Sequence, residues 1–341
     1  MNTPYHYLSP ISDPADFFNR SSEITRITSR IAADRPQSVS IVGGPYMGKT
    51  SIINYLCHPD IQSQYLDKPD EYILLQIDLK KSAPTTPESF FSTVSATLKE
   101  CTGDAMEATF DGFNNQVKKL MQTRHKIVLF MDDFGLVTQH NGFPLEFFSF
   151  MRSVANSNDV GYVTTSPVQL QKLCHTQDIG ESPFFNIFTT VTLEPFKTKA
   201  ARRLVEDPAQ RTGRPLSDFT DWILELGGSS PYLLQLTAHF VYAAGANGID
   251  RKTLEERVNK EARPFLEEMW NTHCSDTERE VLRQVYSDNP IERRYQFAAE
   301  ALERRGYLQR RGEGYALDSQ LISRFVQHQS DTSLWKRLLG R

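Results

Sequence analysis

The chain has 341 residues, which at about 150 residues per domain predicts two or three domains. Its composition, 39% hydrophobic and 23% charged, supports buried cores and excludes a disordered chain. The 38 Lys and Arg residues against 42 Asp and Glu residues give a net charge of −4, which excludes a globally basic nucleic-acid-binding protein but allows a local basic face. No run approaches about 18 apolar residues and no secretory signal is visible, so we expect a cytoplasmic protein without membrane contact.

The four cysteines are far apart and form no CxxC pair; they are Cys57, Cys101, Cys174 and Cys274. Three of them stand next to a histidine, but neighbouring side chains diverge, and the spacings of known zinc sites are absent. We therefore interpret the cysteines as isolated reduced thiols, which agrees with a reducing compartment.

Short apolar runs alternate with helical patterns in the first part of the chain. We expect strands at residues 39–42, 72–77, 127–131, 161–164 and 190–193. Several are nearly continuous in Val, Ile, Leu or Phe, as a parallel sheet covered by helices on both faces requires. Helical spacing of apolar residues between them, as at Phe90, Phe91, Val94 and Leu98, completes the pattern. The alternation predicts a doubly wound α/β domain.

After Pro195 the strand pattern stops, and the pattern of residues 198–264 predicts helices separated by loops rich in Gly and Pro. Ser275 or Asp276 can cap a further helix. A second helical pattern and a hairpin pattern around the turn at 312–314 follow. Helices followed by a hairpin predict a winged-helix domain.

Residues 43–50 read GGPYMGKT and match the phosphate-binding pattern G-x-x-x-x-G-K-[ST], between a predicted strand and a predicted helix. Glycines allow backbone N–H groups to surround phosphate oxygens, and the helix N-terminus adds a favourable dipole. Lys49 can reach the β- and γ-phosphates, and the hydroxyl of Thr50 suits Mg²⁺. The predicted nucleotide-binding residues of this segment are Gly43, Gly44, Pro45, Gly48, Lys49, Thr50 and Ser51.

Two carboxylates end the apolar run 127–131, at the strand end where open α/β sheets bind ligands. We assign Asp132 to Mg²⁺ and Asp133 to the attacking water, as in P-loop NTPases. The side chain of Asp133 is one methylene shorter than the Glu that many relatives carry, which predicts slow hydrolysis. The run 161–164 is followed by Thr165 and Ser166, which either sense the γ-phosphate or cap the next turn.

These motifs resemble the STAND branch of the AAA+-related ATPases, in particular the novel STAND type. Residues 18–20 with Glu23 are similar to its F-x-G-R-x-x-E motif, with Asn19 in place of Gly. Residues 227–235, GGSSPYLLQ, are similar to its G-G-x-P-Y-L-L-Q segment, with one additional residue before Pro231. The resemblance extends over about residues 10–328. It implies that Arg20 lies near the adenine edge and that Pro231 lies near the nucleotide.

The resemblance also implies the order of domains. We expect an N-terminal segment with the adenine-side helix, a P-loop ATPase α/β domain, an all-helical lid, a winged helix and a tail, at residues 1–35, 36–196, 197–270, 271–328 and 329–341.

The implied function is that of a molecular switch that binds ATP and Mg²⁺, hydrolyses ATP slowly and controls assembly with a separate effector or signalling protein, as in bacterial defence or signalling. An ATP-dependent homo-oligomer is compatible with this function. One alternative is a DNA-binding AAA+-like ATPase, a loader or target selector, in which arginine pairs of the winged helix contact DNA weakly. Another is an interaction scaffold that binds nucleotide without using it. The arginine pairs are at residues 293–294, 304–305 and 310–311.

Overall fold

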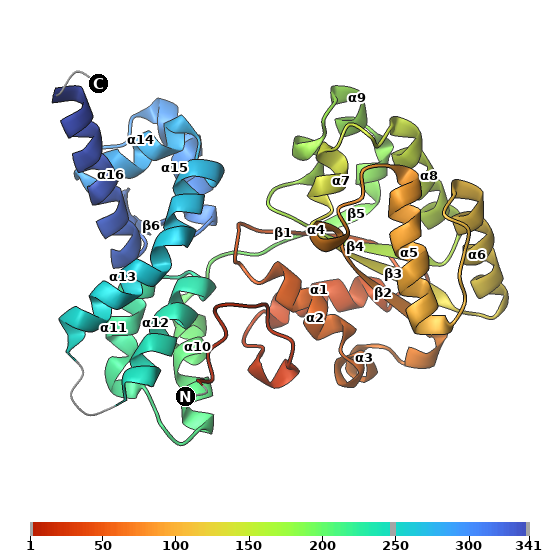
Figure 1. Cartoon of the computed structure of the whole chain (residues 1–341), viewed down its shortest axis with the longest axis horizontal. Helices are drawn as coiled ribbons and strands as arrows, with labels where there is room; N and C mark the ends of the chain where they lie inside the picture. Colours follow the sequence, from red (N-terminus) through yellow and green to blue (C-terminus); the bar gives the residue numbers. More distant parts are fainter. Residues whose placement is uncertain (1–2, 246–249, 339–341) are drawn as a thin grey trace. The chain divides into compact units, whose positions relative to one another are not determined.

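The computed structural model describes residues 3–245 and 250–338. Of residues 331–338 it describes the backbone alone. It divides into two compact units, which are described separately (Figure 1). The sheet unit consists of residues 11–44 and 48–193. The helical unit takes in the described residues up to Pro10, residues 45–47 and those from Glu194 onward.

A parallel five-stranded sheet forms the centre of the sheet unit, with the strand order β2-β3-β4-β1-β5. The strands are β1 (Ser38–Val42), β2 (Tyr72–Asp78), β3 (Lys126–Asp132), β4 (Val160–Ser166) and β5 (Phe188–Thr192). The predicted α/β class is confirmed. Because β4 lies between β1 and β3, the loop after β1 and the acidic end of β3 are separated in space by the end of β4.

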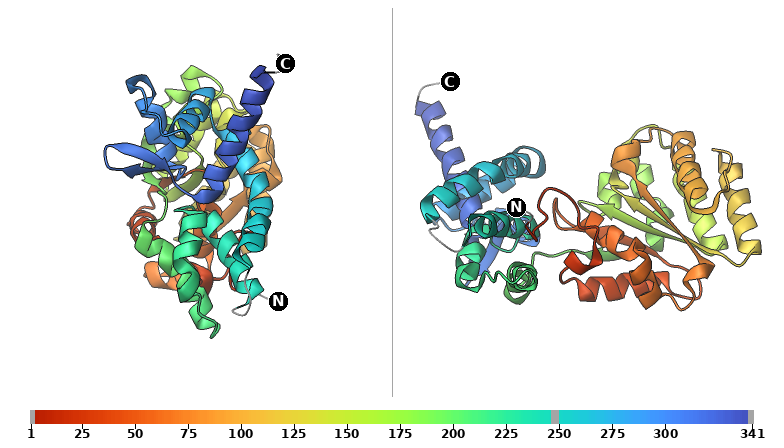
Figure 2. Two further views of the ribbon diagram at one scale, coloured as in Figure 1. Left: turned by 90° about the vertical axis from the view of Figure 1, so that its left-hand side faces the viewer. Right: turned by 60° about the horizontal axis from the view of Figure 1, so that its bottom comes forward.

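Helices lie on both faces of this sheet (Figures 1 and 2). They are α1 (Ser21–Ile31), α2 (Lys49–Cys57), α3 (Pro59–Tyr65), α4 (Leu79–Ser82), α5 (Pro87–Thr102), α6 (Phe110–Gln122), α7 (Gly135–Gln139), α8 (Leu145–Ser157) and α9 (Gln177–Gly180). The helix α1 contacts β1 and β5, whereas α5 contacts β2 and α8 contacts β4. Each crossover between parallel strands is thus covered by at least one helix.

An aromatic core fills the space between the sheet and helices α5, α6 and α8. Phe90 and Phe91 of α5 are fully buried and lie against Phe147 of α8, Phe90 edge-on at a centroid distance of 5.2 Å and Phe91 tilted at 6.0 Å. Leu129 and Met131 of β3 belong to the same core. Residues alternate along a strand, so the intervening side chains of β3 face the side where α2 contacts the strand.

Replacing Phe147 by Ala should lower the free energy of unfolding of the sheet unit by about 3–5 kcal/mol, because it leaves a cavity among fully buried rings. Leu145→Ala, on the same helix but 39% exposed, is the matched control and should cost clearly less. Chemical denaturation followed by circular dichroism measures both. Equal losses for the two variants would contradict the described core.

Helices and one hairpin make up the helical unit. Its elements are α10 (Thr198–Arg211), α11 (Thr220–Gly227), α12 (Pro231–Ala244), α13 (Arg251–Glu268), α14 (Asp276–Tyr286), α15 (Gln296–Arg304), β6 (Leu308–Arg311), β7 (Gly314–Leu317) and α16 (Gln320–Leu338). We call α10–α13 the lid and α14–α16 with its hairpin the C-terminal module. The winged-helix interpretation of this module stays a prediction.

The lid and the C-terminal module share one hydrophobic core. Leu233 of α12 and Phe265 of α13 belong to the same buried cluster as Leu282 of α14 and Ile322 of α16. The domain boundary that we predict after residue 270 therefore falls inside one compact unit and stays a prediction. Residues 329–338 of the predicted tail continue α16, and residues 339–341 lie outside the described part of the chain.

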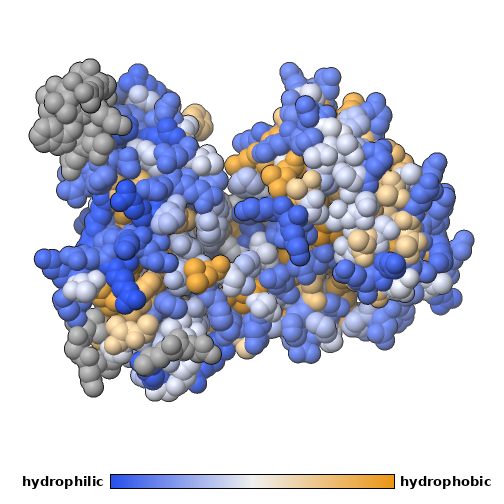
Figure 3. All heavy atoms as spheres, in the orientation of Figure 1, coloured by the Kyte–Doolittle hydropathy of each residue, from blue (hydrophilic) through white to orange (hydrophobic). Residues whose placement is uncertain are grey.

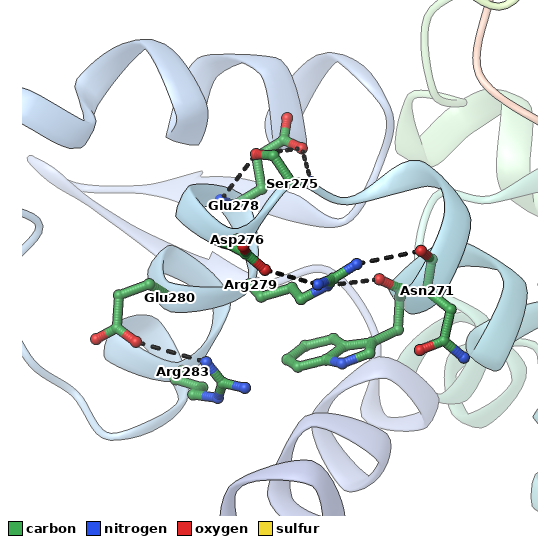
Figure 4. Close-up of polar contacts among 8 residues, drawn as sticks. Asn271, Ser275, Asp276, Glu278, Arg279, Glu280 and Arg283 are labelled. Carbon is green, nitrogen blue, oxygen red and sulfur yellow. Dashed lines mark hydrogen bonds and ion pairs between the residues drawn. The ribbon is translucent and has the colours of Figure 1, made fainter. Parts of the chain in front are cut away.

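Polar contacts define the junction between the lid and the C-terminal module (Figure 4). Of the two residues that the sequence offers as the cap of α14, Ser275 takes this role, through a capping box with Glu278. Arg279 donates from Nε to the carbonyl of Trp270, at 2.7 Å, and from Nη2 to the carbonyl of Asn271, at 3.1 Å. These carbonyls belong to a π-helical turn after α13, whose freed backbone groups need such partners.

Hydrophilic residues cover most of the face drawn in Figure 3, with apolar residues scattered among them. Within residues 3–245 and 250–338, no helix is both long enough and apolar enough to cross a bilayer. Phe297 at the start of α15 is the most exposed large apolar side chain of the described residues, at 84%.

Candidate nucleotide-binding site

The loop between β1 and α2 has the backbone form that phosphate binding requires. Gly48 has a φ of 89° and precedes the first residue of α2, and Tyr46 adopts a left-handed φ of 59°. Only glycine reaches the conformation of residue 48 without strain. The first-turn N–H groups of α2 have no acceptors within the helix and carry the positive end of its dipole. The loop is therefore suited to bind an anion.

Lys49 lies at the start of α2 and is half-buried. Its ammonium group donates to the carbonyls of Gly43 and Gly44, at 2.9 Å each. Burial lowers the pKa of Lys49, and the nearby carboxylates of Asp133 and Asp132 oppose that change. A half-buried cation that is held by the loop and lies near two carboxylates is placed to bind a further anion.

Asp132 joins three parts of the sheet unit at the end of β3. Its Oδ2 accepts a hydrogen bond of 2.6 Å from the hydroxyl of Thr50 in α2, and its Oδ1 accepts one of 2.5 Å from the hydroxyl of Thr165 in β4. The carboxylate is 6% exposed. Thr50 and Asp132, the pair that we predict to bind metal, are thus in direct contact.

The next residue, Asp133, leaves the strand with a φ of 56°, and its N–H donates to the hydroxyl of Thr165 at 2.8 Å. Burial raises the pKa of Asp133, the neighbouring Asp132 raises it further, and Lys49 and Lys80 oppose the rise. Thr165 therefore fixes both carboxylate-bearing residues at once, by donating to one and accepting from the other. This dual role favours Thr165 as part of the site.

Two other predicted residues have partners within the sheet unit. The hydroxyl of Ser166 donates to the carbonyl of Val168 at 2.6 Å, which is the turn-capping alternative that the sequence left open. The hydroxyl of Ser51 accepts from the N–H of Ile11 at 3.0 Å, which fixes the N-terminal segment to α2.

Arg20, with a left-handed φ of 69° and 8% exposure, donates to Glu23 at 2.9 Å. Asn19, where the family pattern has Gly, also has a left-handed φ, 63°. The adenine-edge role of Arg20 stays a prediction.

Two predicted residues belong to the helical unit, Pro45 through the loop residues 45–47 and Pro231 as the first residue of α12. Their placement at the nucleotide therefore stays a prediction. Sequence reasoning missed Asp78 at the end of β2, which pairs in register with Asp132, and Lys80, which follows it. Both act electrostatically on Asp133. The sequence feature that could have identified Asp78 is its place as a polar residue at the end of a predicted strand.

The residues of this site fit a nucleoside triphosphate with Mg²⁺. A hydroxyl and a carboxylate oxygen in contact are hard ligands of the kind that Mg²⁺ prefers. The ammonium group of Lys49 and the start of α2 suit phosphate oxygens. The four cysteines are free thiols. Within the described part of the chain, no three His, Cys, Asp or Glu side chains gather as a separate metal site.

The fold and the arrangement of Lys49, Thr50 and Asp132 define a P-loop NTPase whose site lies at the carboxyl-terminal edge of the parallel sheet. The sequence profile described as "Novel STAND NTPase 2" matches residues 33–291. The chain therefore belongs to the novel STAND NTPase family, as its motifs predict. A search of curated proteins found no match.

Solved structures share this fold at low sequence identity. The Walker-type ATPase PABY2304 of Pyrococcus abyssi superposes with a TM-score of 0.65 at 14% identity, over 94% of this chain and 99% of the other. The ORC2 protein of Aeropyrum pernix, in its ADPNP-ADP complexes, gives 0.61 at 11% identity over 92% and 95%. The ORC1 protein of the same organism, in complex with DNA, gives 0.53 at 12% identity over 98% of both chains.

Thr165→Val should lower the free energy of unfolding by about 1–3 kcal/mol, because it leaves Asp132 and the Asp133 N–H without their partner. Thr164→Val is the matched control. Thr164 is fully buried on the same strand, and its hydroxyl has no partner among the described residues. Its replacement should be neutral or stabilising. Denaturant titration of both variants measures the difference, and a loss in Thr164→Val as large as in Thr165→Val would refute the assignment.

Asp133→Asn should raise the melting temperature at neutral pH and lose that advantage in acid. The pKa of Asp133 is raised in the folded protein, so its contribution to stability is present at low pH and is lost as the pH rises through the folded pKa. A neutral side chain escapes that loss. Melting curves at about pH 7.5 and about pH 4.5 test this. If Asp133→Asn raised the melting temperature more at about pH 4.5 than at about pH 7.5, the described electrostatics would be contradicted.

Proposed function

We propose that this protein is a cytoplasmic ATP-dependent switch that binds ATP with Mg²⁺, hydrolyses it slowly and thereby controls assembly with a separate effector or signalling protein. Membership of the novel STAND family supports the switch class. The single observation that carries the proposal is the contact of Asp132 with Thr50 and Thr165 near the half-buried Lys49. The free thiols agree with a reducing compartment.

In this proposal the chain's own groups divide the work. Lys49 and the N–H groups of the loop bind the phosphates, while Thr50 and Asp132 hold Mg²⁺. When bound, Mg²⁺ neutralises charge that develops on the phosphate oxygens. Asp133 orients the attacking water and accepts its proton, and its raised pKa makes it a stronger base than an ordinary aspartate.

Slow turnover follows from the geometry of Asp133. Its side chain is shorter than that of glutamate, and its backbone is fixed by the bond from its N–H to Thr165. The carboxylate therefore has little freedom to approach the water. A long-lived ATP state suits a switch, because an ATP-dependent assembly, including a homo-oligomer, persists only as long as the nucleotide is intact.

A DNA-binding ATPase is the second candidate, favoured by the likeness of fold to the ORC1 protein that was solved with DNA. The arginine pairs of the C-terminal module differ in their availability. Arg305 is bound to Glu278 and to the carbonyl of His273, and Arg310 pairs with Glu303 at 3.2 Å. Arg294 pairs with Glu292 at 2.9 Å, and Arg293, Arg304 and Arg311 are exposed. So small a free basic surface supports weak, salt-sensitive contact with phosphates rather than base recognition.

Binding of a fluorescent ATP analogue and single-turnover hydrolysis test the proposal. Lys49→Ala should weaken binding by about 10–100-fold, since it removes a charged hydrogen-bonding group, and exposed Lys99→Ala should not change it. Asp133→Asn should bind ATP and fail to hydrolyse it. Wild-type turnover should be below about 1 per second.

Unchanged binding by Lys49→Ala, or a basal turnover of tens per second, would contradict the switch. Strong stimulation of turnover by duplex DNA would favour the second candidate.

A further inference from the structure

The N-terminal residues of the described chain lie on the lid, and we call residues 3–7 the strap. The anchor of the strap is Tyr5, which is 3% exposed. Its hydroxyl donates to the carbonyl of Val205 in α10 at 2.5 Å, and its ring lies edge-on against Tyr242 in α12, with ring centroids 6.0 Å apart. Burial raises the pKa of Tyr5, so the hydroxyl stays protonated and remains a donor. The lid therefore holds Tyr5 as an interior side chain.

A second tyrosine binds the lid two residues further along. The ring of Tyr7 lies edge-on against His239 in α12, with ring centroids 4.9 Å apart, and tilted against Phe240 at 6.1 Å. Its hydroxyl donates to Oε1 of Glu261 in α13 at 3.3 Å. The intervening His6 is exposed. Alternate side chains of an extended peptide lie on one side, so the strap presents both tyrosines to the lid.

Polar contacts fix the position of the strap along the lid. The N–H of His6 donates to Oε1 of Gln235 at 2.7 Å, and the hydroxyl of Thr3 lies 2.7 Å from Nδ1 of His239. A shift by one residue would turn both tyrosines away from the lid. We call six of the lid residues that contact the strap the strap site: Val205, Gln235, His239, Phe240, Tyr242 and Glu261. This site selects an extended Tyr-x-Tyr segment.

The hinge between the strap and the sheet unit, residues 8–10, is short and exposed. Leu8 is 81% exposed, and Ser9 and Pro10 are exposed as well. The next residue, Ile11, is the first of the sheet unit. The chain bends at residues 7–9, although the residue before a proline favours extended backbone. Extension at Ser9 therefore costs little and carries the strap away from its own lid.

We propose that the strap site is a peptide-binding site for Tyr-x-Tyr segments and that a second copy of this chain supplies such a segment, its own residues 3–7, by exchange. The second copy carries the same strap and makes the same contacts, so only the hinge changes. A short tether gives a chain's own strap an effective concentration on the order of millimolar. The exchanged dimer therefore forms at high local concentration of the chain, and it needs no nucleotide.

Fluorescence anisotropy with a labelled peptide of residues 3–8 tests the site. The full-length variant with Tyr5→Ala and Tyr7→Ala has no competing strap of its own and should bind the peptide about ten-fold or more tighter than the wild type. The Tyr5→Phe peptide should bind about five-fold or more weaker, because the carbonyl of Val205 loses its donor. The Leu8→Ala peptide changes an exposed side chain and is the control, which should bind like the parent peptide.

Disulfide trapping between two full-length variants tests the exchange. Thr3→Cys in one chain and His239→Cys in the other place a thiol on each side of a contact that measures 2.7 Å between Thr3 Oγ1 and His239 Nδ1. When the two variants are mixed at high concentration with oxidised glutathione, a covalent heterodimer should form. Leu8→Cys mixed with His239→Cys is the control and should give clearly less heterodimer, because Leu8 lies in the hinge and is exposed.

The outcomes separate the two parts of the proposal. Equal binding of the peptide by the wild type and the double variant, or no binding, would overturn the site and the exchange with it. Peptide binding without a heterodimer above the Leu8→Cys control would overturn the exchange. Should the double variant fail to fold, Tyr7→Ala alone, which keeps the buried anchor, must bind the peptide more tightly than the wild type, and an equal affinity would overturn the site.

Discussion

One buried carboxylate holds the candidate site together. Asp132 receives hydroxyl hydrogen bonds from α2 and from β4, so the phosphate-binding helix, the acidic strand and the strand between them share one acceptor. A buried carboxylate is stable only when such partners replace its water. The strand order makes this arrangement available, since β4 lies between β1 and β3 and its end reaches both. The chemistry proposed for Lys49 and Asp133 depends on that fixed centre.

The helical unit is built on a different balance of forces. Its lid and C-terminal module share an apolar core, which makes them one compact body. Near Ser229 and Asp318 the apolar contact gives way to hydrogen bonds and a cavity. Apolar cores resist separation over large areas, whereas a few hydrogen bonds can exchange between two arrangements at small cost.

The sequence predicted the class of fold, and it pointed to Thr50 and Asp132, which the structure brings into contact, because those signals are local. The phosphate-binding pattern consists of neighbours in the chain: the strand before residue 43, the glycines, and the helix that begins at Lys49. The apolar strand that ends in Asp132 is likewise visible in a few consecutive residues. Partners distant in sequence carry no such signal. Sequence alone therefore left open whether Thr165 or Ser166 faces the site, and it missed Asp78.

The same limit applies outside the site. The loop before α12 was visible as a departure from the family pattern by one additional residue, but the partner of its Ser229 lies 89 positions further along the chain. Asn19 stands where the family pattern has Gly, and it adopts a left-handed φ of 63°, a conformation that asparagine reaches more readily than most residues.

Calorimetric titration of the wild-type protein with ATP, in the presence and absence of Mg²⁺, tests the central claim most directly. If Thr50 and Asp132 hold the metal beside the phosphates, removal of Mg²⁺ should weaken binding by about ten-fold or more, which corresponds to about 1.4 kcal/mol. In Thr50→Val, affinity should be nearly the same with and without Mg²⁺. No heat of binding, or an affinity that ignores Mg²⁺ in the wild type, would contradict the account.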